Sequence, residues 1–450
     1  MSNQTSARID PSANVEWTWL SDSDPSLASQ SIKWSRYSDV ENRIIEDAFK
    51  AGLPIATLDE IYIDFENNIQ VSNNDINDQR PIQRQVRHRM NTHLREERFM
   101  ISPIPAKNPF SGLRGWTSNF IMHTKKELKL KKEESPSHNP RIIPMLVEKA
   151  AQGIIEEGKN IGKTREAEWM ANQLMQEKNN GVKEVWRCCA RLYTMESFLY
   201  KKINETMRLV GSKEHENVWR SKTRTFGPFC LLLWDDPYNH LPLTGGKMLY
   251  RGANLSDDLI AQYTKLSRSS DQRGSFQAFT SSSRSRAKAE QFGNVLFVMQ
   301  VNYAYTTDLS PLSEYPDEEE ELIHPGVCFT INGTRYDPSK NKHEIYLTLT
   351  HNVDDKDKKK IFVCLDDHAN PAVRLYNGVC RASSAVLLPI MDAFNAARPG
   401  PSAGGDHRLS RMTNGGYYRD RNGTLCEDPT GTLADDCYHR ACNQPRYDLD

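Results

Sequence analysis

The sequence predicts an α+β protein built from a small N-terminal unit, a helical lobe and a strand-rich core, in that order. Three observations lead to this prediction. Strand-like runs and one helical pattern share residues 14–90, and helical spacing of apolar residues dominates residues 141–208. After Phe229 the apolar residues gather in short strand-like runs. A chain of 450 residues is long enough for two or three such units.

The N-terminal unit is expected to combine short strands with one helix. Apolar residues recur at helical spacing over residues 40–51, with Asp39 as the expected N-cap and Gly52 just past the end. Residues 1–13 show no such pattern and are expected to be disordered. Alternating or aromatic runs predict strands at residues 15–20, 31–37, 61–65 and 83–89.

Three tryptophans stand close together in this unit. Trp17 or Trp19, together with Trp34 and the later Glu46, resembles the WWE domain, which is named for two Trp and one Glu. The resemblance implies a small half-barrel over residues 14–90. Some WWE domains bind the iso-ADP-ribose unit of poly(ADP-ribose), and others bind proteins. The resemblance therefore implies ADP-ribosylated or ubiquitin-pathway proteins as partners, although the tryptophans could simply fill the barrel. Matching ligand positions here are Trp34, Tyr37, Gln70, and Arg80 or Arg84.

Residues 91–140 have the composition of a linker, rich in proline and lysine. The Lys-rich run at residues 125–132 predicts a solvated helix face, with a nuclear-import signal or an anion-binding stripe as alternatives. The catalytic unit is expected over residues 141–375. Residues 376–450 return to Gly, Pro, Arg and Asp and are expected to be mostly disordered, with one helix near residues 386–397.

The region after Phe229 predicts a mostly antiparallel, two-sheet core behind the helical lobe. The strand-like runs are FCLLLW (229–234), KMLYRG (247–252), QAFTSS (277–282), NVLFVMQV (294–301), CFTI (328–331), EIYLTLT (344–350) and IFVCLD (361–366). Two of these runs, and the acidic stretch at residues 317–321, carry the residues that suggest chemistry.

Arg251 ends one run, and Gly252 follows where the backbone must turn or approach a ligand closely. A guanidinium can clamp a pyrophosphate through parallel hydrogen bonds. Thirty residues later Ser281 lies in the run Phe279-Thr280-Ser281-Ser282-Ser283, and Glu318 and Glu320 follow in the pattern Glu-x-Glu. In extended backbone these two carboxylates would point to the same side.

This order of Arg, Ser and Glu-x-Glu over about residues 145–350 resembles the arginine-specific mono-ADP-ribosyltransferases of the vertebrate ecto-transferase type. The resemblance implies an ADP-ribosyltransferase fold and NAD or NADP as cosubstrate. The poly(ADP-ribose) polymerase branch uses His, Tyr and Glu instead, and Arg251 disfavours chain elongation.

The resemblance also implies roles for single residues. Glu320 would stabilise the positive charge that builds on the ribose when nicotinamide leaves. Ser281 would position that carboxylate, and Glu318 would orient the acceptor guanidinium and withdraw its proton. Tyr315 would touch the target protein, and Phe292 would face the nicotinamide or belong to the core.

Two alternatives concern the acidic run. Glu319 and Glu321 form a competing pair for the catalytic position, and residues 317–321 would otherwise be a solvated acidic loop. The predicted function is transfer of ADP-ribose from NAD to arginine side chains of target proteins. The alternatives are a catalytically inactive WWE scaffold and an NAD glycohydrolase. A WWE-bearing ubiquitin ligase lacks the necessary zinc-ligand spacing.

Composition indicates which partners, cellular location and metal sites to expect. The net charge is −1, with 38% apolar and 26% charged residues, so no direct nucleic-acid binding is expected. No apolar segment approaches the length of a membrane span or a secretory signal, which predicts a soluble protein of the cytoplasm or nucleus without membrane contact. The nine cysteines include no C-x-x-C pair, so no metal site is expected.

Overall fold

The computed structural model describes residues 15–21, 33–86, 118–131, 134–238, 243–268 and 273–350, and the backbone of the antiparallel pair β15 (Gly416–Arg419) and β16 (Leu425–Asp428). The expectations for residues 1–13, for the IFVCLD strand and for a helix near residues 386–397 lie outside the described residues. The chain divides into two units, Met1–Lys358 and Lys359–Asp450, and all other elements described below belong to the first.

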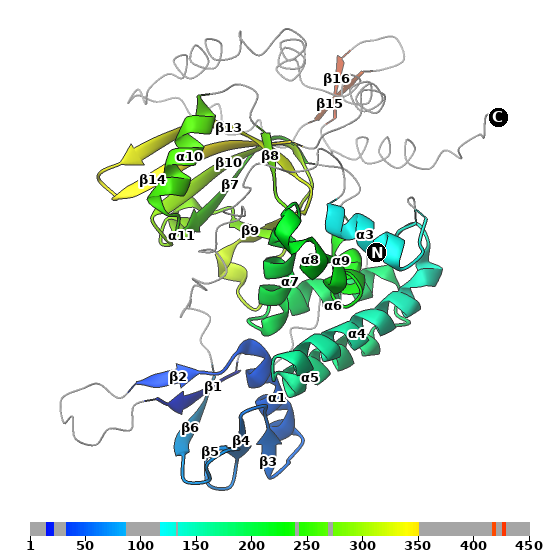
Figure 1. The fold of residues 1–450 in the computed structure, drawn as a ribbon, viewed down its shortest axis with the longest axis vertical. Coiled ribbons are helices and arrows are strands. Elements are labelled where there is room, and N and C mark those ends of the chain that lie inside the picture. Colours follow the sequence, from blue (N-terminus) through cyan, green and yellow to red (C-terminus); the bar gives the residue numbers. More distant parts are fainter. Residues whose placement is uncertain are drawn as a thin grey trace. The chain divides into compact units, whose positions relative to one another are not determined.

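The N-terminal unit combines strands with one helix, α1 (Asp39–Lys50), as predicted, and the strands pair antiparallel (Figure 1). Among the described residues the strand order is β2-β1-β6-β5-β4-β3. The sequence analysis missed two of these strands, β3 and β5, which are three and four residues long. The strands are β1 (Val15–Leu20), β2 (Trp34–Arg36), β3 (Ile55–Thr57), β4 (Ile61–Asp64), β5 (Ile69–Ser72) and β6 (Gln79–Val86).

Helix α1 begins one residue earlier than expected, because Ser38 rather than Asp39 is its N-cap. The Ser38 hydroxyl accepts a hydrogen bond from the Glu41 N–H at 3.2 Å, and the Glu41 carboxylate accepts one from the Ser38 N–H at 3.0 Å. This reciprocal capping box satisfies two N–H groups of the first turn. Asp39 is therefore a helical residue, and its side chain is available for contacts elsewhere.

Hydrogen bonds to the carboxylate of Glu46 hold the helix of this unit against its sheet. Trp17 is buried at 3% exposure, and its indole N–H donates to Glu46 at 3.0 Å. Arg84 donates two further hydrogen bonds to the same carboxylate at 2.9 and 2.8 Å. Burial by itself would raise the pKa of Glu46, but the hydrogen bonds from Arg84 and Trp17 outweigh it and lower that pKa. Trp34, at 38% exposure, lies outside this core.

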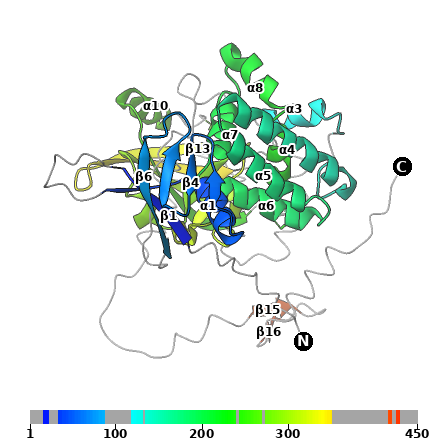
Figure 2. The same cartoon turned by 90° about the horizontal axis from the view of Figure 1, so that it is seen from below.

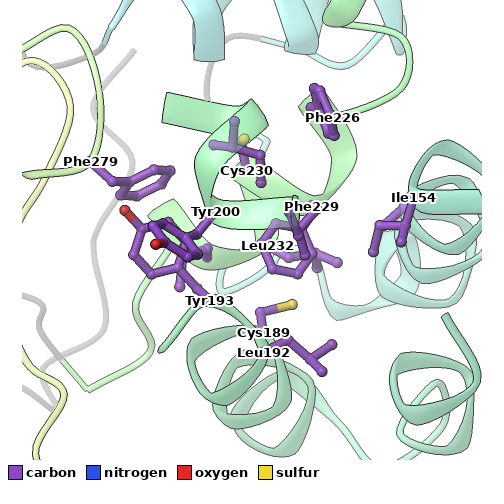
Figure 3. Packing of buried hydrophobic residues seen from close by; sticks show 14 of the residues in the cluster. Ile154, Cys189, Leu192, Tyr193, Tyr200, Phe226, Phe229, Cys230, Leu232 and Phe279 are labelled. Carbon is purple, nitrogen blue, oxygen red and sulfur yellow. The ribbon is translucent and has the colours of Figure 1, made fainter. Parts of the chain in front are cut away.

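The helical lobe packs α4, α5 and α6 side by side (Figures 1 and 2). Its core includes Phe229 and Leu232 of α9 together with Cys189 and Leu192 of α6 (Figure 3). The helices are α3 (Asn119–Glu127), α4 (Ile143–Asn160), α5 (Thr164–Gln176), α6 (Val182–Thr194), α7 (Phe198–Arg208), α8 (Glu216–Lys222) and α9 (Gly227–Trp234), with 3₁₀ turns at Pro140–Ile142 and Lys213–His215.

Two expectations about this lobe are wrong. The FCLLLW run forms helix α9 rather than a strand, because an unbroken apolar run fits a buried helix as well as a buried strand. Pro228 in its first turn suits a helix start. The linker expected over residues 91–140 also ends too late, since Phe120 and Ile121 of α3 are fully buried in the lobe's core. Composition could not show that a Lys-rich segment carries a buried apolar face.

The second sheet has the order β11-β12-β9-β7-β10-β14-β13-β8 among the described residues. Its pairs are antiparallel except for β10 with β14. Strands β7 and β9 join through one residue pair, Tyr250 opposite Ser283, so a three-stranded and a five-stranded part meet there. The strands are β7 (Leu243–Ala253), β8 (Arg273–Ser275), β9 (Thr280–Ser283), β10 (Val295–Ala304), β11 (Thr306–Asp308), β12 (Glu320–Ile323), β13 (Cys328–Asp337) and β14 (Lys342–Thr350).

The three-stranded part lies between two apolar cores. Leu322 and Phe279 belong to the core of the helical lobe, whereas Ile323 belongs to the core of the five-stranded part. Phe279 lies beside Tyr193, with 5.5 Å between ring centroids, and near Tyr200 (Figure 3). Packing on both sides therefore fixes strands β9 and β12, which carry the serine run and the end of the acidic run.

The N-terminal unit contacts the helical lobe through α1 and α5. Val40 of α1 is fully buried and belongs to the lobe's apolar core. The Asp47 carboxylate accepts a hydrogen bond from the Trp169 indole at 2.9 Å. Asp59 accepts hydrogen bonds from the N–H groups of Arg165 and Glu166 at 2.7 and 3.3 Å, in the first turn of α5. An acid at this position stabilises the start of the helix.

Glu166 lies in the contact between the N-terminal unit and the helical lobe. Its titration makes the free energy of unfolding of the protein depend on pH. Burial, followed by the nearby Glu41, raises the pKa of Glu166 from 4.5 to about 7. Between these values the folded protein holds a proton that the unfolded chain has lost, so the free energy of unfolding falls as pH rises from about 4.5 to 7. Glu166→Gln should raise that free energy by up to roughly 2–3 kcal/mol at pH 8 and change it little at pH 4.5.

Urea unfolding at both pH values measures this difference. The matched control is Glu168→Gln on the same helix, since Glu168 is half-exposed and paired with Arg165. It should change the free energy of unfolding by less than about 0.5 kcal/mol at either pH. A Glu166→Gln effect of the same size at pH 4.5 and pH 8 would contradict the assigned titration.

Candidate active site

Arg251 and Ser281 contact each other directly. Arg251 is buried near the end of β7, and its guanidinium donates a hydrogen bond to the backbone carbonyl of Ser281 on β9. The two strands are neighbours in the sheet. Residues thirty positions apart in the sequence thus meet at the join between β7 and β9.

Glu320 is on the next strand, β12, which pairs with β9 on its other side. Glu320 lies opposite Ser283 and Leu322 lies opposite Ser281. Side chains of directly opposite residues lie on the same face of a sheet, and residues two apart share a face. Ser281, Ser283 and Glu320 therefore share one face, and Glu320 is completely buried.

Glu318 is buried as well, but it does not continue the strand. It ends the 3₁₀ turn Pro316–Glu318, and Glu319 adopts a left-handed conformation with φ 49°. The expectation that Glu318 and Glu320 alternate in extended backbone is therefore wrong. A tight turn positions Glu318, whereas strand pairing positions Glu320.

Backbone contacts hold the Glu-x-Glu segment from both sides. The Ser283 hydroxyl donates to the Glu318 carbonyl at 2.7 Å, and the Arg284 N–H donates to the Glu319 carbonyl at 3.1 Å. From the other side the Leu309 N–H donates to the Glu320 carbonyl at 3.0 Å. Ser283 and Arg284 are site residues that the sequence analysis missed. The spacing of Ser283 from Ser281 was the available signal.

The competing pair, Glu319 and Glu321, is engaged in ion pairs. Glu321 is buried on the opposite face of β12, where Lys247 lies at 2.6 Å and Arg284 at 3.3 Å. Thr306 donates a further hydrogen bond to it at 2.6 Å. Glu319 is partly exposed and pairs with Lys288 at 3.1 Å. Both carboxylates thus have a structural use away from the face that Ser281 and Ser283 share.

Gly252 allows close packing between β7 and the chain that follows β9. A Cβ atom at this position would lie 2.4 Å from the Ala289 carbonyl oxygen and 2.6 Å from the Phe292 Cβ. Phe292 itself is buried. The structure thus gives Gly252 and Phe292 a packing role. The expected contacts of both residues with NAD stay predictions.

This packing predicts a stability effect. Gly252→Ala should lower the free energy of unfolding by roughly 1–3 kcal/mol, because the added methyl group overpacks a backbone contact. Urea unfolding measures the change. Gly333→Ala on β13 is the matched control, since a Cβ there meets nothing within 4 Å, and it should be neutral to within about 0.5 kcal/mol. Equal stability of the two variants would rule out the contact.

Tyr315 does not face solvent. It is 8% exposed, and its hydroxyl donates a hydrogen bond to Asp39 of α1 at 2.8 Å. The neighbouring Glu314 pairs with Arg43 of the same helix at 2.6 Å. The position predicted to touch an acceptor protein is therefore in contact with the N-terminal unit. Acceptor recognition by Tyr315 stays a prediction.

The predicted ligand residues of the N-terminal unit fall into two groups. The Tyr37 hydroxyl donates to the Gln70 side chain at 2.6 Å, and Arg80 lies opposite Gln70 in the sheet. The Arg80 guanidinium also lies 5.1 Å from the centre of the Trp19 ring. Arg84 is bound to Glu46, and Arg80 is engaged as well, through a carboxylate and a backbone carbonyl. Of the two arginines considered for ligand binding, Arg80 is the one that lies opposite Gln70.

Comparison with protein families agrees with this architecture. The WWE domain model matches residues 15–84, and the model described as NAD:arginine ADP-ribosyltransferase matches residues 158–355. The chain carries a WWE domain followed by an ADP-ribosyltransferase domain. Trp17 and Glu46 are buried in the WWE domain, with Arg84 bound to Glu46 from the surface. Arg251, Ser281 and Glu320 lie on adjacent strands of the ADP-ribosyltransferase domain. NAD-dependent ADP-ribosylation is the chemistry of that second domain.

Several solved structures of bacterial ADP-ribosyltransferases and effectors are similar to part of this chain. HopU1 of Pseudomonas syringae is 17% identical over 40% of this chain and 87% of its own, with a TM-score of 0.32. The type III effector XopAI of Xanthomonas axonopodis is 15% identical over 53% and 95%, with a TM-score of 0.34. Exoenzyme S of Pseudomonas aeruginosa is 12% identical over 53% and 99%, with a TM-score of 0.32. No residue role is taken from these weak similarities.

No curated protein matches the chain. Within the described parts of the WWE and ADP-ribosyltransferase domains, no group of three or more His, Cys, Asp or Glu residues is arranged to hold a metal ion. None of the helices in the described parts of the chain is both long and apolar enough to cross a membrane.

Proposed function

We propose that this protein is a mono-ADP-ribosyltransferase that transfers ADP-ribose from NAD to arginine side chains of target proteins. The observation that supports the proposal is the placement of Arg251, Ser281 and Glu320 on three adjacent strands, β7, β9 and β12, with Arg251 bonded to the Ser281 backbone. In this proposal the WWE domain spans residues 14–90, and the transferase domain includes α3 (Asn119–Glu127) and extends to residue 375.

The residues fit NAD as a substrate. NAD supplies the bond between nicotinamide and ribose that is broken in the reaction. Arg251 offers a buried cation suited to the pyrophosphate, because a guanidinium binds two phosphate oxygens at once. Ser281 can both donate and accept a hydrogen bond, so it suits contact with a ribose hydroxyl and a carboxylate together.

Glu320 supplies the negative charge that stabilises the sugar as nicotinamide leaves. Its burial strengthens this effect, because a carboxylate acts over a longer range in a medium of low dielectric constant. Glu318 lies two residues away on a separately held turn, which suits it to a different partner, the acceptor guanidinium. Arginine remains protonated at neutral pH, with a pKa above about 12, so attack requires a base that removes its proton.

Tyr37, Gln70 and Arg80 support a second role for the WWE domain as a reader of ADP-ribosylated proteins. They form a contiguous polar group, with an aromatic hydroxyl, an amide and a guanidinium in adjacent positions. Binding of ubiquitin-pathway proteins is the alternative use of this domain. We also propose that the protein acts in the cytoplasm or nucleus.

Labelled NAD tests the enzymatic proposal. The full chain, incubated with NAD labelled in the adenylate part and with an arginine-rich acceptor protein, should transfer the label to the acceptor and release nicotinamide. Mass spectrometry of the labelled acceptor should locate the ADP-ribosyl group on arginine side chains. Nicotinamide release without labelled acceptor would instead indicate an NAD glycohydrolase, and no release at all would indicate an inactive scaffold.

A further inference from the structure

The loop between β11 and β12 carries Glu318 and lies against helix α1 of the WWE domain. Two contacts join the loop to α1, and a third joins it to the helical lobe. The Tyr315 hydroxyl donates to one Asp39 carboxylate oxygen at 2.8 Å, and Arg43 pairs with Glu314 at 2.6 Å. Glu314 also lies 3.6 Å from Arg191 of the helical lobe. The side chains of Arg43 and Glu314 are only 5% and 11% exposed, so water screens this pair weakly.

Asp39 connects the loop to a third element. Its second carboxylate oxygen accepts a hydrogen bond from the Glu196 N–H at 2.7 Å, in the connection between α6 and α7. One carboxylate thus holds together the WWE helix, the helical lobe and the catalytic loop. Because Ser38 caps the helix, Asp39 is not needed as the N-cap and its side chain can serve this purpose.

The contact acts close to Glu318. The Glu318 N–H donates to the Tyr315 carbonyl at 3.1 Å within the 3₁₀ turn, so displacement of Tyr315 displaces the turn. Displacement of the turn should move Glu320 less than Glu318, because the strand of Glu320 pairs with β9 on one side and β11 on the other. Loosening the loop should therefore affect the two glutamates unequally.

We infer that helix α1 of the WWE domain is a positioning element of the transferase, in which Asp39, through Tyr315, holds the turn that presents Glu318 to the acceptor. This inference rests on the proposed function, because it assigns Glu318 to the acceptor arginine. Asp39 and Tyr315 are positioning residues in this arrangement. The WWE domain then has a part in the reaction that does not depend on any ligand of its own.

Two single variants of the full chain test the inference. Tyr315→Phe removes only the hydroxyl, and Asp39→Ala removes the carboxylate. Each should lower the ratio of arginine transfer to NAD hydrolysis by roughly tenfold, since each breaks a hydrogen bond to a buried charged group. The double variant should be no worse than the more affected single variant, because both act on one contact. Asp39→Asn keeps two polar atoms at the position and should retain most of the ratio.

The matched control is Asp47→Ala. Asp47 lies on the same helix and also contacts the helical lobe, but its partner is Trp169 of α5 rather than the loop. This variant should leave the ratio within about twofold of the unaltered chain, as expected for a site without a shared partner. Equal ratios for Asp39→Ala, Tyr315→Phe and Asp47→Ala would overturn the inference.

Hydrogen–deuterium exchange separates this inference from the proposed function. Peptides covering residues 309–319 should exchange faster in Tyr315→Phe and Asp39→Ala than in the unaltered chain, whereas Asp47→Ala should leave them unchanged. If the unaltered chain shows neither transfer nor hydrolysis, the proposed function fails, and the exchange rates still decide whether α1 holds the loop. Unchanged exchange in all three variants would refute the positioning role even in an active enzyme.

Discussion

Glu320→Gln is expected to abolish both arginine transfer and NAD hydrolysis, with losses of roughly a hundredfold to a thousandfold. The substitution keeps the size of the side chain and removes its charge. Because Glu320 is completely buried on the face that it shares with Ser281 and Ser283, water cannot replace that charge. Rates of nicotinamide release, measured with and without an arginine acceptor, check both activities.

Glu319→Gln is the matched control for this experiment. Glu319 belongs to the same acidic run and pairs with Lys288 at the surface, so its variant should keep nearly full activity. The comparison also tests the register of the catalytic glutamate. Loss of activity in the Glu319 variant, with activity retained in the Glu320 variant, would move the catalytic position and contradict the geometry of β12. Thermal unfolding of both variants confirms that the fold is intact.

Glu318→Gln is expected to separate the two activities. Transfer to arginine should fall by roughly a hundredfold or more, because no other group is assigned to take the guanidinium proton. Hydrolysis of NAD should persist at a reduced or comparable rate, since Glu320 and its strand are unchanged. The measurement is the ratio of labelled acceptor to free ADP-ribose formed from the same NAD.

Asp317→Asn controls for the loss of negative charge in the turn. Asp317 directly precedes Glu318 but is exposed, so its variant should preserve the ratio of transfer to hydrolysis. Unchanged transfer in the Glu318 variant would refute its assigned role. Equal losses of transfer and hydrolysis would instead indicate that Glu318 serves the NAD side of the reaction.

Much of the fold followed from local patterns. The helix at α1, the helical lobe and most strands of the second sheet were predicted, because 3.6-residue and two-residue apolar periods are written directly in the sequence. The same reasoning misassigned α9, where an unbroken apolar run has no period to distinguish helix from strand. It also ended the linker too late, because only two of the buried residues in α3, Phe120 and Ile121, are apolar and they leave little trace in this segment.

The candidate site was likewise predicted in part from the sequence. Arg251, Ser281, Glu318 and Glu320 were chosen from residue type, order and spacing, and the structure places Arg251, Ser281 and Glu320 on adjacent strands. The predicted geometry of Glu318 was wrong, since alternation holds only in extended backbone and a left-handed residue follows a turn there. Spacing alone also could not separate Glu320 from Glu321, because only strand register decides which face each side chain takes.

The sequence by itself determined that a WWE domain precedes an ADP-ribosyltransferase domain. It also determined which residue types are available for chemistry. These properties depend on neighbours along the chain, which a pattern can display. Only the tertiary structure decided that Glu321 belongs to an ion-pair network, that Gly252 is needed for packing, and that Asp39 contacts Tyr315. These are contacts between distant segments, and their energies depend on burial and geometry that local sequence does not encode.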